Sequence, residues 1–435
     1  MKFAFFTLGC KVNQYETQAM EQMLTAEGHT LGSFDEPCDG YIINTCTVTA
    51  VSDKKSRNAI RRARRCNPHA IIGVCGCYAQ AEPDQLRALE VDVLSGTDGR
   101  AEFIRHVIRA AQERIRWEHV EDAGLPRSFE ILPAGGLAAR TRALLKIEDG
   151  CNNFCTYCKI PYVRGRVRSM PLAEAVRQAQ QLAREGYREI VVNGIEISSW
   201  GAERKDGSCL RQLLEAVLRA VPSVRIRLGS LEPRTIDEEF CRTLCGFDNL
   251  CPQFHLSLQS GSDSVLKRMH RKYDTARYLQ SVELLRRYFP GCAVTTDLIV
   301  GFPGETEEEF RQSLAFVKTC AISAFHIFPY SRRAGTAASS MGGQLTQAVK
   351  ESRAAQAAEI ADALEQAYLR AQVGTEQEVL FEQEQDGLFV GHAKNYVRVY
   401  AEGRALQNMV RTVRVTSLFR DGVRGELLPV QTDAG

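Results

Sequence analysis

The 435-residue sequence contains no apolar run that approaches the roughly 20 residues of a membrane-spanning helix. Its first residues, Lys2 to Leu8, are too few for a secretory signal and lack a small-residue cleavage site. Neither sign of charge dominates: the formal net charge is only +2, which neither favours nor excludes a nucleic-acid partner. We therefore expect a cytosolic protein with no membrane partner, in which any RNA contact comes from a local basic patch.

Cysteine, by contrast, is plentiful, with 15 residues in the chain. Because disulfides are rare in a reducing compartment, we interpret this number as a sign of metal binding. The length predicts two or three domains. A hydrophobic share of 44% with a charged share of 25% is typical of globular proteins.

Three of the cysteines, Cys151, Cys155 and Cys158, fall within eight residues, and the next cysteine is Cys209. We call these three the loop triplet. Thiolates suit iron–sulfur clusters, zinc and copper, and a four-iron cluster ordinarily takes four of them. The uneven spacing differs from the paired C-x₂-C of a zinc site. It favours a cluster with one iron open to a ligand over the alternatives, a zinc site or three structural cysteines.

Residues 1–120 alternate between buried strand patterns and helical patterns, which predicts an α/β domain with a parallel sheet. Three of the strand patterns end in cysteine, at Cys10, Cys46 and Cys77, which we call the strand-end triplet. Because ligands gather at the carboxyl ends of parallel strands, we expect the three to converge and to hold a second cluster with one open iron. Cys75 is the rival of Cys77, since strand alternation places both on the same side.

A linker is expected over residues 121–140, followed by six strand patterns separated by amphipathic helices over residues 141–372. Six such units predict a partial, open (β/α)₆ barrel, with the loop triplet after its first strand. Later strands end in polar loops that begin at Asn193, Ser230, Gln259 and Gly301 and should face the same cavity. After a long helix, residues 373–435 contain four short strand patterns, which predict a small β-barrel.

Several basic features have two interpretations each. Residues 54–65 hold seven Lys or Arg, which either contact RNA phosphates or form a solvated helix face. Three arginines follow the loop triplet: Arg164, Arg166 and Arg168. They either bind phosphates or a carboxylate of a ligand, or they form a basic rim. His326 ends the sixth strand pattern and is interpreted as a structural residue.

Two sets of motifs resemble known families. The segment Cys151-Asn-Asn-Phe-Cys-Thr-Tyr-Cys158 resembles the cluster loop of the radical S-adenosylmethionine (SAM) superfamily. The strings Thr-Leu-Gly-Cys10-Lys-Val-Asn-Gln-Tyr-Glu, Asn-Thr-Cys46-Thr-Val and Gly-Cys77-Tyr-Ala-Gln resemble the N-terminal domain of the methylthiotransferases. Residues 373–435 resemble TRAM, an RNA-binding, OB-like barrel. The resemblance selects Cys77 over Cys75 as a ligand.

The resemblance implies two 4Fe–4S clusters, one on each triplet, together with SAM. In that family an electron from the loop cluster cleaves SAM, the resulting radical takes hydrogen from C2 of an adenine, and a methylthio group is then transferred. Implied partners are a tRNA, bound through its anticodon loop, and ferredoxin or flavodoxin as electron donor. The implied SAM contacts are Tyr157, Gly194, Ile195, Glu196, Ser230, Glu232 and Gln259, and the implied RNA contacts are Lys394, Tyr396, Arg398 and Arg411.

The motif Gly-Cys-Lys-Val-Asn around Cys10 resembles that of the methylthiotransferase branch that acts on N6-threonylcarbamoyladenosine next to the anticodon of tRNA. The expected function is therefore addition of a methylthio group to C2 of that nucleoside. The alternatives are a methylthiotransferase that acts on isopentenyladenosine or on a ribosomal protein, and a non-catalytic iron–sulfur RNA-binding protein. The oligomeric state is left open by the sequence.

Overall fold

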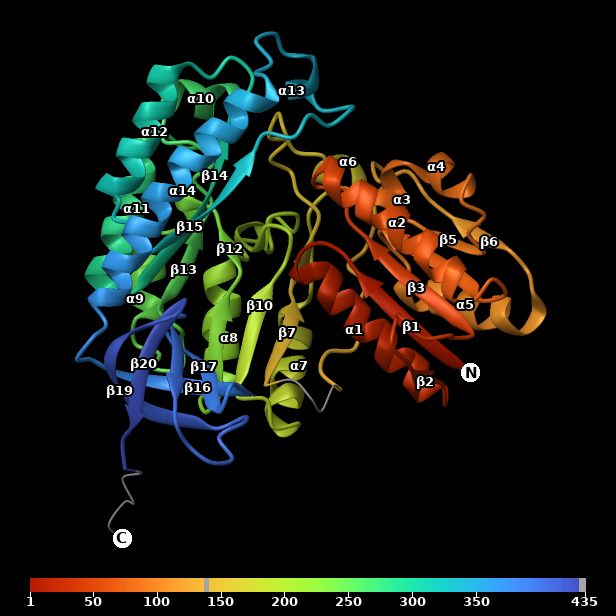
Figure 1. Ribbon diagram of the computed structural model, residues 1–435, viewed down its shortest axis with the longest axis horizontal. Helices are drawn as coiled ribbons and strands as arrows, with labels where there is room; N and C mark the ends of the chain where they lie inside the picture. The colour runs from red at the N-terminus through yellow and green to blue at the C-terminus, as the bar shows by residue number, and fades with distance from the viewer. Residues whose placement is uncertain (137–140, 430–435) are drawn as a thin grey trace.

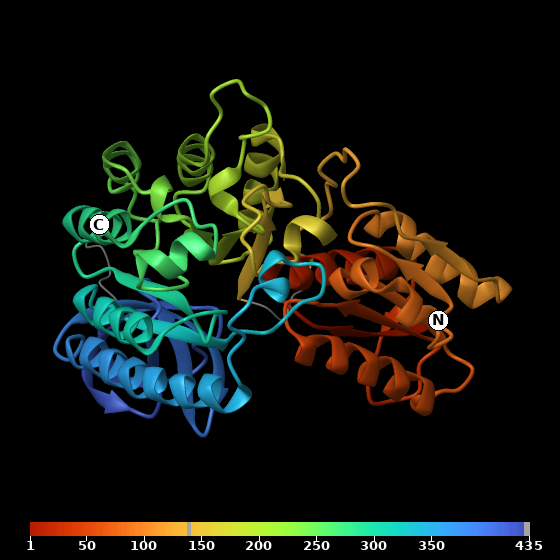
Figure 2. The ribbon, with the colours of Figure 1, turned by 90° about the horizontal axis from the view of Figure 1, so that it is seen from above.

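The computed structural model describes residues 1–136 and 141–429. The chain forms three regions: a layered N-terminal α/β region, a central region of parallel strands flanked by helices, and a small C-terminal β-barrel (Figures 1 and 2). The α/β class, the partial central barrel and the terminal β-barrel expected from the sequence are confirmed. No described helix is long and apolar enough to span a membrane.

The N-terminal region is a parallel six-stranded sheet in the order β2-β1-β3-β4-β5-β6. Its strands are β1 (Lys2–Thr7), β2 (Thr30–Leu31), β3 (Gly40–Thr45), β4 (Ile71–Gly76), β5 (Val93–Ser95) and β6 (Trp117–His119). Its helices are α1 (Lys11–Ala26), α2 (Ala50–Cys66), α3 (Cys77–Ala81), α4 (Pro83–Arg87) and α5 (Arg100–Glu113). Met20 of α1 and Phe103 of α5 pack on one face, and Ile60 of α2 and Tyr78 of α3 pack on the other.

Some N-terminal elements differ from the predicted ones. The first helix, α1, begins at Lys11, directly after the extended backbone of Cys10. The strands β2 and β6 were not predicted, because two or three residues are too few to show a pattern. In the described part of the predicted linker, residues 121–136, there is no helix or strand, and residues 137–140 lie outside the described residues.

The central strands follow each other in sequence order around an open ring. They are β7 (Arg142–Lys146), β10 (Glu189–Asn193), β11 (Arg225–Leu228), β12 (Ser230–Leu231), β13 (Gln253–Leu256), β14 (Ala293–Val300) and β15 (Ala324–Pro329). All pair in parallel, as one sheet β11-β10-β7 and a second sheet β12-β13-β14-β15. A single bridge between Ile226 and Leu250 connects the two sheets. The third predicted strand corresponds to β11, and the polar loop expected to begin at Ser230 instead begins with the short strand β12, separated from β11 by Gly229.

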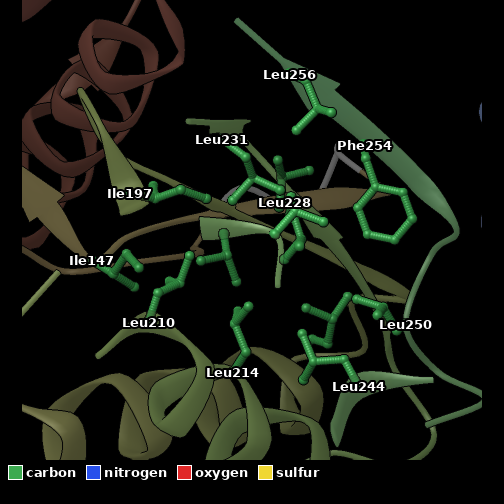
Figure 3. Packing of buried hydrophobic residues seen from close by; sticks show 14 of the residues in the cluster. Ile147, Ile197, Leu210, Leu214, Leu228, Leu231, Leu244, Leu250, Phe254 and Leu256 are labelled. Atoms are coloured by element: carbon green, nitrogen blue, oxygen red, sulfur yellow. The ribbon is translucent and has the colours of Figure 1, made fainter. Parts of the chain in front are cut away.

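Amphipathic helices cover the outside of this ring. The largest are α7 (Leu172–Arg184), α8 (Leu210–Ala220), α11 (Thr275–Tyr288), α12 (Glu307–Thr319) and α14 (Gln347–Arg370). Leu210 and Leu214 of α8 meet Leu228 and Phe254 of the strands in the central core (Figure 3). Burial of such side chains stabilises the ring by roughly 1.5–3 kcal/mol for each side chain.

The C-terminal residues form a closed barrel in the order β16-β17-β18-β20-β19. Its strands are β16 (Glu376–Gln385), β17 (Leu388–Ala393), β18 (Arg398–Ala401), β19 (Val410–Phe419) and β20 (Gly422–Leu427). Phe381, Val399 and Val413 fill its interior. The sequence pattern predicted four of the strands, and it missed β20 because glycines at positions 422 and 425 interrupt its apolar pattern.

A buried carboxylate attaches this barrel to the central strands. Glu189, the first residue of β10, is fully buried and accepts hydrogen bonds from Arg225 (2.5 Å) and Arg227 (2.7 Å). Both arginines also donate to backbone carbonyls of β17 and the loop after it, at 3.1 Å to His392 and 2.9 Å to Lys394. Although burial raises it, the pKa of Glu189 is held at about 2 by the arginines. A buried charge is costly unless paired, so this cluster fixes the barrel at the start of the central strands.

Candidate active site: two thiol triplets and two adjoining cavities

The strand-end triplet lies at the carboxyl edge of the N-terminal sheet. Cys10 follows β1, Cys46 follows β3, and Cys77 begins α3 directly after β4. Gly9 has left-handed backbone (φ +112°), and a Cβ atom added there would lie 3.2 Å from the Sγ atom of Cys46. Burial raises the pKa of Cys77 to about 12, and the neighbouring thiols of Cys46 and Cys10 also act to raise it. The fold thus brings these three thiols together.

Gly76 separates the two cysteines that strand alternation left equivalent. Its φ of +101° ends β4, and a Cβ atom there would lie 2.5 Å from the carbonyl oxygen of Thr45, so only glycine fits. Cys75 stays in the sheet and packs with Phe103 in the core. Cys77 lies beyond the turn in α3, where the alternation argument no longer applies.

Arg164 is wholly buried beside the strand-end triplet. Its Nε–H donates to the Sγ atom of Cys77 at 3.3 Å. Its two terminal nitrogens donate to Glu16 at 2.8 Å, to Asp149 at 3.0 Å and to Asn13 at 2.7 Å. Because Asp149 lies two residues before the loop triplet, this one side chain connects the surroundings of both triplets.

The same carboxylates bind further cations. Glu16 of α1 also pairs with Arg100 of α5 (3.1 Å) and with Lys146 of β7 (3.1 Å). Asp149 pairs with Lys146 (2.5 Å) and with Arg168 (3.2 Å). All these side chains are nearly inaccessible to solvent. The network therefore fixes the N-terminal sheet against the first central strand, next to which α1 lies (Figure 1).

The three arginines after the loop triplet do not behave alike. The prediction of a basic rim or of phosphate contacts is wrong for Arg164 and Arg168, because both are buried in ion pairs with Asp149. Arg166 is exposed, and its guanidinium lies 4.5 Å from the ring centre of Phe154.

The loop triplet is held by backbone bonds on both sides. The N–H of Cys151 donates to Gly165 at 3.1 Å, and the N–H of Thr156 donates to Met269 at 3.1 Å. Arg271, which the sequence motifs did not indicate, donates to the Sγ atom of Cys155 at 3.0 Å. Burial raises the pKa of the Cys158 thiol to about 12, and the Cys155 thiol raises it further.

The loop triplet lines a small cavity of about 140 Å³, which we call the small cavity. Five of the seven expected SAM contacts line it with the thiols: Tyr157, Ile195, Glu196, Ser230 and Glu232. Gly194 lines a different cavity, described next. Gln259 has left-handed backbone (φ +71°), donates its N–H to Asp297 at 2.9 Å and is not among the residues that line either cavity.

A large cavity of about 690 Å³ lies between the three regions of the chain. Its walls include Cys10 and Lys11 of the N-terminal region, Asp297 and His326 of the central strands, and Tyr396 near the C-terminal barrel. His326 is exposed into it, and the ring of His255 lies 6.3 Å away. Ser230 lines both cavities, so the two adjoin there.

Unpaired buried polar atoms mark the ends of the central strands. Neither side-chain polar atom of Asn193 has a hydrogen-bond partner among the described residues, and nor does Oε1 of Glu148. The other oxygen of Glu148 accepts from the backbone N–H of Glu196 at 2.7 Å. Burial raises the pKa of Glu148 well above its usual range. Unsatisfied buried groups are costly, so these atoms indicate a polar ligand at this position.

The donor sets fit iron–sulfur clusters. Each triplet offers three thiols, soft ligands that suit iron. Those of the loop triplet are buried or half-buried and face a cavity where a further ligand can bind, whereas in the strand-end triplet Cys46 and Cys77 are buried and Cys10 is exposed. Within residues 1–136 and 141–429, no three His, Cys, Asp or Glu side chains are close enough to hold one metal ion. A four-iron cluster spreads its thiolates more widely than a single ion does. The polar atoms at Asn193 and Glu148 similarly fit the amino and carboxylate groups of SAM.

The residues considered as RNA contacts are distributed over two surfaces. On α2, Lys54, Lys55, Arg61 and Arg65 are exposed. Of the C-terminal candidates, Tyr396 and Arg398 line the large cavity, whereas Lys394 pairs with Glu378 (3.3 Å) and Arg411 donates to Leu428 (3.2 Å).

Two family models match the chain. Residues 145–317 match the radical SAM superfamily, and residues 2–96 match a family described as uncharacterized protein family UPF0004. The fold is similar to that of TsrM, a radical SAM methyltransferase from Kitasatospora setae whose structure contains cobalamin and a [4Fe-4S] cluster. The TM-score is 0.57 at 16% identity, over 78% of this chain and 77% of that one.

Curated relatives match almost the whole chain. The chain is 41% identical to the threonylcarbamoyladenosine tRNA methylthiotransferase MtaB of Bacillus subtilis (strain 168), over 96% of this chain and 94% of the relative. The MtaB of Aquifex aeolicus (strain VF5) is 36% identical, over 93% and 97%. The tRNA-2-methylthio-N(6)-dimethylallyladenosine synthase of Moorella thermoacetica is 33% identical, over 98% of both chains. With its two thiol triplets and these full-length relatives, the chain belongs to the methylthiotransferase family of radical SAM enzymes.

Proposed function

We propose that this protein adds a methylthio group to C2 of N6-threonylcarbamoyladenosine next to the anticodon of tRNA. The observation that carries the proposal is the placement of the two triplets. Cys10 of the strand-end triplet lines the large cavity, the loop triplet lines the small one, and the two cavities adjoin at Ser230. A base in the large cavity is therefore accessible from both. The relatives named for this substrate cover nearly the full chain.

In this proposal the strand-end and loop triplets each hold a 4Fe–4S cluster. SAM binds in the small cavity against Tyr157, Ile195, Glu196, Ser230 and Glu232. It extends from there toward Gly194, which lines the large cavity, and toward Gln259. When bound, these groups supply the reductive cleavage of SAM and the sulfur chemistry, and the protein binds, orients and excludes water. Asn193 and Glu148 offer unpaired polar atoms to the methionine end of SAM. Arg271 neutralises part of the thiolate charge.

The tRNA is bound by two surfaces in this proposal. The exposed cations of α2 contact phosphates, which gives affinity without sequence selection. Tyr396 and Arg398 contact the anticodon loop, where unstacked bases meet aromatic side chains. We assign residues 1–120 to the methylthiotransferase domain, 121–140 to a linker, 141–372 to the radical SAM core and 373–435 to TRAM. Ferredoxin or flavodoxin supplies the electron, and the reaction takes place in the cytoplasm.

The test uses anaerobically reconstituted protein with SAM, dithionite and anticodon stem-loops that carry either threonylcarbamoyladenosine or isopentenyladenosine. Formation of 5′-deoxyadenosine and of the 2-methylthio nucleoside is followed by mass spectrometry. Methylthiolation of the threonylcarbamoyl substrate alone is expected. Product from the isopentenyl substrate would assign the alternative nucleoside.

The remaining alternatives give other results in the same assay. An enzyme for a ribosomal protein cleaves SAM but modifies neither stem-loop. A non-catalytic iron–sulfur RNA-binding protein binds the stem-loops and makes no 5′-deoxyadenosine. Nucleoside analysis of tRNA from a deletion strain provides an independent check, because the 2-methylthio form of the substrate should disappear.

A further inference from the structure

Lys11 differs from the other long cationic side chains that line the large cavity. Arg227 is paired with Glu189 at 2.7 Å, and Arg398 is paired with Asp421 at 2.5 Å. In the described part of the chain, Lys11 has neither an ion pair nor a side-chain hydrogen bond. Its ammonium group is therefore a cation in the cavity wall that forms no ion pair with a carboxylate of the described residues, and Glu189 acts on it only through space.

The surroundings of Lys11 combine this charge with an aromatic surface and a cluster ligand. Lys11 directly follows Cys10, and both line the cavity. Tyr396 lines it as well, with 42% of its surface exposed. Its ring stacks on His392, with 4.7 Å between the ring centres, and the guanidinium of Arg227 lies 4.7 Å from its ring centre. A flat base with an anionic substituent is the kind of ligand that such a wall accommodates.

We propose that Lys11 determines substrate specificity by pairing its ammonium group with the carboxylate of the threonylcarbamoyl substituent. This inference rests on the proposed function and names the side chain that selects its substrate. The threonine part of that substituent ends in a carboxylate, which unmodified adenosine and apolar N6 substituents lack. Because Lys11 is bonded to Cys10, a carboxylate held there keeps the modified base beside the strand-end triplet.

Selection follows from the cost of leaving the charge unpaired. A neutral or apolar substituent in the same place removes water from Lys11 and offers it no counter-charge. A site built for a charged partner rejects the analogue without that partner more strongly than an apolar site rejects a polar one. Lys11 therefore favours the charged substrate and disfavours its neutral analogues.

The experiment pairs a change in the protein with a change in the substrate. Wild type, Lys11→Gln and Lys11→Arg are loaded with clusters, and each is given stem-loops that carry threonylcarbamoyladenosine or its neutral methyl ester. Stem-loop affinity is measured by fluorescence anisotropy, and kcat/KM is measured for methylthiolation. For the wild type we expect a preference for the charged substrate of about 10- to 100-fold, as for a hydrogen bond to a charged group. Lys11→Gln should lose most of that preference, and Lys11→Arg should keep most of it.

A matched control is Lys318→Gln, on the outer helix α12, where the exposed lysine has no side-chain partner among the described residues. This variant should keep the wild-type preference. Iron content and 5′-deoxyadenosine formation are recorded for every variant, because Lys11 neighbours a cluster ligand. Should Lys11→Gln load poorly, anisotropy with Lys11→Met and Lys11→Arg still compares the two stem-loops.

Each outcome has one meaning. If the wild type modifies the charged substrate and Lys11→Gln retains the full preference for it, the inference is overturned and the proposed function stands. If the wild type modifies neither stem-loop, the proposed function fails, whatever Lys11 does. Equal weakening of both stem-loops in Lys11→Gln also overturns the inference, since it would indicate a phosphate contact.

Discussion

The two triplets reach similar chemistry by different routes. The loop triplet lies within eight residues, so one short segment places all three thiols. The strand-end triplet is assembled from the ends of β1, β3 and β4 and therefore depends on the whole N-terminal sheet. A single glycine turn decides whether Cys77 belongs to it. The loop triplet therefore depends on its own loop, whereas the strand-end triplet depends on strand register.

The two arginines that donate to the triplets, Arg164 and Arg271, differ in whether a carboxylate balances their charge. Arg164 donates to Cys77, but its charge is balanced by Glu16 and Asp149. Arg271 donates to Cys155, and it also donates to the neutral hydroxyl of Tyr273 at 3.0 Å. We infer that Arg164 mainly holds the regions together, whereas Arg271 adds net positive charge at the small cavity.

The largest expected effect comes from removing either whole triplet by Cys→Ala substitution. Reconstituted wild type should hold about eight iron atoms per chain, and each triple variant about half of that. Without the loop triplet, SAM cleavage and methylthiolation should both be lost. Without the strand-end triplet, SAM cleavage to 5′-deoxyadenosine should remain while methylthiolation is lost. Iron analysis and product analysis by mass spectrometry check this.

This prediction requires the two clusters to assemble independently, as expected for separate domains. Circular dichroism and the iron content of each variant serve as controls for folding and loading. A folded, half-loaded strand-end variant that makes no 5′-deoxyadenosine would contradict the division of labour. It would mean that both clusters take part in the reductive step.

A smaller loss of bound iron is expected when the cysteines on either side of Gly76 are replaced one at a time. Cys77→Ala should remove the N-terminal cluster, which is about half of the iron. Cys75→Ala should keep the iron, because Cys75 packs in the core with Phe103. Its cost should be limited to a core defect of roughly 1–2 kcal/mol in the free energy of unfolding. Equal iron loss in both variants would show that the strand end has been misassigned.

The parts of this site that depend on local sequence patterns were predictable from the sequence. Strand and helix alternation placed the strand-end cysteines at one sheet edge, and the spacing of the loop triplet needed no fold at all. Strand alternation could not choose between Cys75 and Cys77, and only the family resemblance favoured Cys77. The physical difference is the left-handed backbone of Gly76 against Thr45, which strand alternation does not reveal.

Charged partners were equally inaccessible from local patterns. Arg164 and Arg168 looked like a surface patch. Both pair with Asp149, and Arg164 also pairs with Glu16 of α1, which is far away in sequence. Arg271 carried no motif, since its role comes from the fold that places it against Cys155. Ion pairing between distant segments is a property of the assembled structure, and composition does not reveal it.

Replacement of Arg164 and replacement of Arg166 should change the free energy of unfolding by different amounts. Arg164→Met leaves the buried carboxylates of Glu16 and Asp149 with fewer partners, and breaking such a network costs about 3–5 kcal/mol. Arg166→Met is the matched control, two residues away and exposed, with an expected cost of about 0.5 kcal/mol. Urea unfolding of the apo-proteins measures both. Similar midpoints for the two variants would show that the network does not join the regions.

The smallest expected effect concerns the reduction potential of the loop cluster. Positive charge and hydrogen bonds to the sulfur atoms stabilise the reduced, more negative state, so Arg271→Gln should lower the potential of this cluster. We expect a shift of about 60 mV, which is a tenfold change in a one-electron equilibrium. The strand-end cluster should keep its potential, because Arg271 contacts only the loop triplet. Redox titration followed by electron paramagnetic resonance measures each cluster when the other triplet has been replaced by alanine. A shift of both potentials, or of neither, would remove the distinction between a balanced and an unbalanced arginine.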